Sequence, residues 1–164
     1  MHSRVFWKLS RFEKMKYTFI LDENVYIQSH TCKNIKDSQD NFHSLHLILK
    51  ILEECHKVGL TNELITKYQE KSKTFRKKGK IYSNVPRIWN KILYRSDKYR
   101  LSDNHLKDLP TNLQHDRHVI EPTIFLQGIL VTTDDKLRSR LTEWAKKKGI
   151  SLNIKTPEEA LTFT

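Results

Sequence analysis

The sequence is poor in cysteine and glycine and has no long apolar run, and each absence disfavours a class of protein. Its two cysteines, Cys32 and Cys55, have no Cys-x-x-Cys spacing, so neither a disulfide framework nor a zinc site is expected. Four glycines and no G-x-G-x-x-G or Walker-type loop disfavour a nucleotide cradle, and with it a small-molecule α/β enzyme. No apolar segment is long enough to span a bilayer. We therefore expect a soluble, cytoplasmic protein with reduced thiols and no membrane contact.

Acidic residues are also few compared with basic ones. The sequence has 19 Asp and Glu and 30 Lys and Arg, which gives a formal net charge of +11. A basic surface attracts polyanions through counterion release, so nucleic acid is the first partner to expect. The length of 164 residues predicts one domain. We assign it to residues 15–164, because Met15 directly precedes the first predicted strand, and residues 1–14 are expected to be an appended arm or a misassigned start.

Apolar spacing and turn signals predict alternating strands and helices. Strands are expected at 17–21, 57–60, 129–132 and 150–154. Helices are expected from Phe42 to Cys55, after the N-cap Thr61 and around Pro86. Another is expected from Asp116, with a kink or late start at Pro122. Two more are expected near the end of the chain, one that ends at Gly149 and one that follows a capping box at Thr156. This order predicts a three-layer α/β/α domain with a mostly parallel central sheet.

The segment 71–100 is strongly basic and interleaved with aromatic residues, and part of it is expected to be helical. Lys and Arg on such a helix can contact phosphates, while an exposed aromatic ring can stack on a base. For Trp89 we favour a position in the hydrophobic core over a stacking role. The cations proposed to bind nucleic acid are Lys67, Lys71, Lys73, Arg76, Lys77, Lys78, Lys80, Arg87, Lys91 and Arg95.

Two short apolar runs end in acid. Residues 19–21 lead into Asp22 and Glu23, and residues 129–132 lead toward Asp134 and Asp135. Ligand sites of parallel sheets lie outside the carboxyl ends of the strands, so these ends can bring Asp22 and Asp134 together. Clustered carboxylates raise one another's pKa unless a cation lies between them, and all-oxygen ligation suits Mg²⁺ or Mn²⁺. The alternatives are that Asp134 or Asp135 caps the following helix and that Asp22 and Glu23 begin a solvated loop.

Three segments in this order resemble the motifs of the PIN-domain family. The segment Leu21-Asp22-Glu23-Asn24-Val25 is similar to the family's L-D-T-N-V signature. The segment from Asp116 to Ile120 resembles its D-x-x-I helix start, and Val131 to Leu137 resembles its V-T-x-D-x-x-L strand end. The resemblance covers most of the chain from residue 17 onward.

This resemblance implies an α/β/α domain that cleaves RNA phosphodiesters with Mg²⁺ or Mn²⁺. Residue by residue, it assigns Asp22, Asp116 and Asp134 to the acidic metal ligands, and Asn24 and Thr132 to supporting polar positions. The leading hypothesis is a metal-dependent endoribonuclease, in which a water activated by the metal attacks the RNA in line. Many relatives are toxins of toxin-antitoxin modules, so an antitoxin or another protein partner, and a homodimer, are further expectations.

The fourth acidic position departs from the family pattern. The family usually has glutamate before the apolar or tyrosine residue in the helix after strand two, and here Lys67 precedes Tyr68. Glu63, one turn earlier, is expected either to reach the metal or to pair with Lys67 at i, i+4. A second metal would need Glu63, Asp135 or a substrate phosphate. The rival hypothesis is therefore a PIN-like module that binds nucleic acid with weak or no turnover.

Histidines flank the second acid of the site, as His115 and His118. Either one is a possible general acid or metal ligand. A neutral histidine on the surface is the commoner role for this residue type, and we expect it for both.

Overall fold

The computed structural model describes residues 15–79 and 85–164, so the expectations for residues 1–14 and for Lys80 lie outside the described residues. Its five-stranded sheet is parallel throughout, in the order β3-β2-β1-β4-β5. The strands are β1 (Thr18–Leu21), β2 (Lys57–Leu60), β3 (Tyr99–Leu101), β4 (Ile129–Val131) and β5 (Asn153–Lys155). The predicted α/β class is confirmed.

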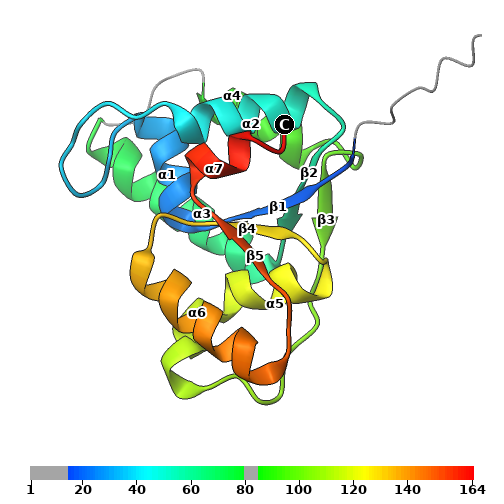
Figure 1. Cartoon of the computed structure of the whole chain (residues 1–164). Helices are drawn as coiled ribbons and strands as arrows, with labels where there is room; N and C mark the ends of the chain where they lie inside the picture. The colour runs from blue at the N-terminus through cyan, green and yellow to red at the C-terminus, as the bar shows by residue number, and fades with distance from the viewer. Residues whose placement is uncertain (1–14, 80–84) are drawn as a thin grey trace, which may run out of the picture.

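Helices cover both faces of this sheet and make three layers. Figure 1 shows α1, α2, α4 and α7 gathered on one side and α5 and α6 on the other. The helical bounds are α1 (Glu23–Thr31), α2 (His43–Glu53), α3 (Asn62–Lys77), α4 (Val85–Leu93), the 3-10 helix η1 (Thr111–Asp116), α5 (Arg117–Phe125), α6 (Asp135–Lys148) and α7 (Pro157–Leu161). Within the described residues, no helix is both long and apolar enough to cross a membrane.

Strand β1 lies at the centre of the hydrophobic core. Phe19, Ile20 and Leu21 have no solvent exposure, as expected for a strand buried on both faces. Beside them, Tyr26 and Tyr68 stack with ring centroids 4.3 Å apart, and the ring of Trp89 lies 4.8 Å from that of Tyr26. Trp89 is buried in this cluster, so its predicted core position is confirmed.

Local capping signals define several helix ends as predicted. The side chain of Thr61 accepts a hydrogen bond from the amide of Leu64, and Thr156 and Glu159 form a reciprocal capping box. Gly149 ends α6 in the left-handed conformation with φ of 68°. The Thr61 hydroxyl also donates to the carbonyl of His118 at 3.4 Å. That carbonyl lacks an i+4 amide donor because the residue at that position of α5 is a proline.

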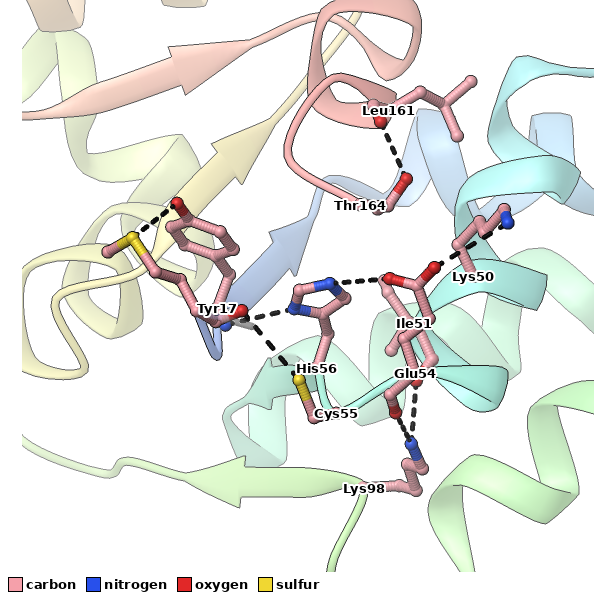
Figure 2. A network of polar contacts seen from close by, with 10 residues as sticks. Tyr17, Lys50, Ile51, Glu54, Cys55, His56, Lys98, Leu161 and Thr164 are labelled. Carbon is pink, nitrogen blue, oxygen red and sulfur yellow. Dashed lines mark hydrogen bonds and ion pairs between the residues drawn. The ribbon is translucent and has the colours of Figure 1, made fainter. Parts of the chain in front are cut away.

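A polar network lies at the amino end of the sheet, at the opposite end from Asp22 and Asp134 (Figure 2). The amide of Tyr17 donates to the buried ring of His56 at 3.1 Å, and the other ring nitrogen of His56 lies 3.1 Å from Glu54. Lys50 pairs with Glu54, and the buried ammonium of Lys98 donates to carbonyls at the end of α2. Lys98 thus fixes the start of β3, although it belongs to the basic segment.

Candidate metal centre

Strands β1 and β4 are neighbours in the centre of the sheet and end at the same level. Their register pairs Leu21 with Val131, so Asp22 and Thr132 follow at adjacent positions. The Asp22 amide donates to the Val131 carbonyl at 3.0 Å, and the Thr132 hydroxyl donates to Asp22 Oδ2 at 2.8 Å. The same hydroxyl accepts from the amide of Asp134 at 3.0 Å. One threonine therefore links the two acid-tipped strands.

The carboxyl group of Asp22 is buried and holds its proton unusually strongly. Burial is the main cause, and a hydrogen bond with Glu23 and the charge of Glu23 add to it, raising the pKa of Asp22 from 3.8 to about 8. The hydrogen bond from Thr132 partly offsets this rise. The alternative that Asp22 and Glu23 begin a solvated loop is wrong, because α1 starts at Glu23 and Asp22 is only 4% exposed.

Glu23 is the second acid at this edge, and a buried histidine holds it. Oε2 of Glu23 lies 2.8 Å from Nε2 of His118, across 95 positions of sequence. Burial opposes ionisation of Glu23, but the hydrogen bonds with His118 and Asp22 outweigh it and lower the pKa of Glu23. Ligand atoms of Asp22, Glu23 and His118 lie within 4.8 Å of one another.

Asp116 approaches the same charges from the other layer. It precedes α5 and makes no side-chain cap, and its carboxyl is half-buried. Burial raises the pKa of Asp116, the nearby His118 and His115 lower it, and the charges of Asp134 and Glu23 raise it. The charge of Asp116 in turn raises the pKa of Asp22, although Asp116 is outside the group of close ligand atoms that Asp22, Glu23 and His118 form among the described residues.

Asp134, one of the predicted metal ligands, also caps a helix. Oδ1 of Asp134 accepts from the amides of Lys136 at 3.0 Å and Leu137 at 3.1 Å, so the alternative cap role is confirmed for this oxygen. Asp135 is exposed and Asn24 is half-buried. Together with Asp134, these two side chains line a cleft of about 570 Å³ beside the start of α6. The cleft thus adjoins the acids without containing Asp22.

The doubtful fourth ligand does not join the site. Glu63 is exposed in the first turn of α3, and it is outside the one group of three close ligand side chains found among residues 15–79 and 85–164. In that same part of the chain, no ion pair links Glu63 to Lys67, so the i, i+4 alternative also finds no support. Tyr68 is fixed by its hydroxyl, which donates to the Leu21 carbonyl at the end of β1.

Two residues of this centre were misjudged from the sequence. Glu23 is absent from the ligands assigned from the sequence, and His118 is expected there on the surface, whereas His118 is 2% exposed and contacts Glu23. His115 is exposed as predicted. The only sequence signal for His118 is its place two residues after Asp116, and the contact it makes is too distant in sequence for a local pattern to predict.

The basic residues lie mainly on α3 and α4. Those described are exposed, apart from the half-buried Lys67, and Arg95 forms an ion pair with Asp97 at 2.8 Å. Lys73 and Arg76 line a groove of about 690 Å³ between α3, α4 and β3. The groove also contains Tyr94, a residue that is 86% exposed. Cations and an accessible aromatic ring therefore share one concave surface.

The residues at the carboxyl edge fit a divalent cation. The carboxyl groups of Asp22 and Glu23 lie so close that they repel each other when both are ionised, and either a proton or a cation between them offsets this repulsion. Asp116 and Asp134 extend the negative field on the side of η1 and α6. Oxygen donors of this kind are those that Mg²⁺ and Mn²⁺ take.

Comparisons with known proteins add no relative. A scan against models of protein families found no match to this chain, and a search of curated proteins found no similar sequence. The motif resemblance to the PIN-domain family therefore stays a prediction.

Proposed function

We propose that the protein is a metal-dependent endoribonuclease, with Asp22, Asp116 and Asp134 around Mg²⁺ or Mn²⁺. The convergence of acids at the ends of β1 and β4 and at the start of α5 carries this proposal. The motif resemblance to PIN-domain ribonucleases and the net charge of +11 support RNA as the substrate.

The side chains have separate roles in this proposal. Asp22, fixed by Thr132, and Asp116 hold the cation, while Asp134 contributes the oxygen that the α6 cap leaves free. When bound, a divalent cation lowers the pKa of a water nucleophile and offsets negative charge on the scissile phosphate. Lys73, Arg76 and Tyr94 line the groove in which a single strand would be held by phosphate contacts and base stacking.

An RNA cleavage assay tests the proposal. Labelled single-stranded RNA is incubated with the protein and Mn²⁺ or Mg²⁺, and with Asp22→Asn and Asp116→Asn in parallel. We expect cleavage that EDTA stops and that each variant lowers by at least about 100-fold. Asp103→Asn is the matched control, because Asp103 is an exposed acid outside the cluster. Cleavage that persists in EDTA or in both variants would refute the metal mechanism.

A second candidate function is nucleic-acid binding with weak or no turnover. Two observations favour it: Oδ1 of Asp134 is committed to capping α6, and Lys67 stands where the family has glutamate. RNA binding without cleavage in any divalent metal, lost when Lys73 and Arg76 are both changed to alanine, would select this candidate. The predictions of an antitoxin partner and of a homodimer stay predictions.

A further inference from the structure

The buried ring of His118 is an unusual neighbour for a carboxylate metal site. Its side chain has no solvent exposure, and Nε2 points at Glu23 from a distance of 2.8 Å. The ring therefore adds a nitrogen donor to a centre whose sequence motifs predict oxygen donors alone.

Hydrogen bonding satisfies only one nitrogen of this ring in the described part of the chain. Within the described part of the chain, Nδ1 of His118 is buried without a hydrogen-bond partner. A buried polar atom without a partner costs about 1–3 kcal/mol, and such atoms require a reason other than stability. Among residues 15–79 and 85–164, the polar contact of the ring is that of Nε2 with Glu23, beside Asp22.

We propose that Asp22, Glu23 and His118 form a mixed carboxylate–imidazole site that binds a first-row transition-metal ion in preference to Mg²⁺. Their ligand atoms lie within 4.8 Å of one another, a spacing that one ion can bridge. Imidazole nitrogen suits Zn²⁺ and the other later first-row ions, whereas Mg²⁺ takes oxygen donors. The inference rests on the metal binding in the proposed function and not on RNA cleavage.

Glu23 has a definite place in this site. It is the first residue of α1, where a carboxylate is favoured by the helix dipole, and it lies between the other two ligands. It supplies a carboxylate at the centre where Lys67 interrupts the family pattern. A bound ion would displace the proton held by Asp22 and would take the place of the hydrogen bond between Glu23 and Nε2 of His118, leaving the ring proton on Nδ1.

Direct metal binding by the full-length protein tests the inference. Isothermal titration with Co²⁺, Zn²⁺ and Mg²⁺ is performed on the wild type, His118→Asn and His115→Asn. We expect His118→Asn to weaken Co²⁺ and Zn²⁺ binding at least about tenfold. Replacing even a residue that only hydrogen-bonds to a metal ligand typically lowers metal affinity by that factor. Mg²⁺ binding should change by less than about threefold. His115→Asn is the matched control and should bind all three ions as the wild type does.

Pulsed EPR of the Mn²⁺-loaded wild type gives a second readout that needs no variant. We expect coupling from a directly bound ¹⁴N, which persists in His115→Asn and disappears in Glu23→Gln or His118→Asn. Absence of ¹⁴N coupling, or unchanged Co²⁺ affinity in folded His118→Asn, would overturn the inference. Co²⁺ binding through His118 without RNA cleavage would overturn the proposed function alone, and Asp22-dependent cleavage without nitrogen ligation would overturn the inference alone.

Discussion

Thr132 links the acid-tipped strands, so the substitution Thr132→Val should be costly although the shape of the side chain is kept. Thr132 is only 2% exposed. Its hydroxyl donates a hydrogen bond to Asp22 Oδ2 at 2.8 Å and accepts one from the Asp134 amide at 3.0 Å. A bond to a carboxylate contributes about 1.5–3 kcal/mol and a bond to an amide about 1 kcal/mol. We expect the free energy of unfolding to fall by about 3 kcal/mol. For a chain of this length, the melting temperature would fall by about 6–12 °C.

Urea and thermal unfolding of three variants measure this effect. Thr132→Ser keeps the hydroxyl and should stay within about 1 kcal/mol of the wild type. Thr133→Val is the matched control, because it makes the same exchange at the half-buried neighbour. If Thr132→Val unfolds within 1 kcal/mol of the wild type, the hydroxyl does not join the two strand ends as described.

The same substitution should also weaken metal binding. The bond from Thr132 lowers the pKa of Asp22, so its loss raises that pKa further and makes the proton harder to replace by a cation. We expect metal affinity near neutral pH to fall in Thr132→Val and to recover partly as the pH is raised. Titration calorimetry at two pH values measures this difference, and an affinity that does not depend on pH would contradict the reasoning.

Three further predictions concern stability. The folded pKa of Asp22, about 8 against the usual 3.8, means that stability present at acid pH is lost as pH rises through 8. Asp22→Asn should therefore remove a slope of up to about 1.4 kcal/mol per pH unit from the metal-free protein between pH 5 and 8, measured by urea unfolding. Gly128→Ala should destabilise by about 2 kcal/mol or more in the same assay, because its Cβ would lie 2.8 Å from the Thr18 carbonyl. Trp89→Phe should cost about 2 kcal/mol in thermal melts, because the indole bond to Ser29 at 3.0 Å is lost.

Local patterns predicted most of the fold because they act over a few residues. The apolar spacing of 42–55 and the caps at Thr61 and Thr156 depend on neighbouring residues alone, and each appears in the structure as predicted. The apolar runs before Asp22 and Asp134 indicated the two central strands for the same reason.

Among the elements that were not predicted, α1 and β3 have weak sequence patterns. Helix α1 has little amphipathic character, since Val25 to Thr31 are all buried, polar residues included. Its sequence therefore shows no alternation between an apolar and a polar face. Strand β3 has three residues at the edge of the sheet, two of them exposed, and it follows the basic segment without a distinct apolar run.

The candidate site was predictable where strand ends define it and unpredictable where packing does. Asp22 and Thr132 are brought together by the register of two parallel strands, which the sequence pattern indicates. The contact between Glu23 and His118 depends on how α5 lies against α1, and no spacing in the sequence encodes that distance. Pro122 also affects how α5 packs. It has no amide hydrogen to donate to the His118 carbonyl, so this carbonyl accepts from Thr61 and links α5 to the start of α3.

The carboxylates at the carboxyl edge of the sheet change how the lysine at position 67 is interpreted. A lysine in place of an acid weakens a metal site if no other carboxylate takes that place. Here Glu23 lies beside Asp22, and its lowered pKa keeps it ionised while Asp22 holds the proton. The metal-free edge therefore carries a proton and a histidine where a cation would bind. The capacity for metal then depends on displacing that proton, and Lys67, half-buried one residue before Tyr68, is predicted to contact a phosphate instead.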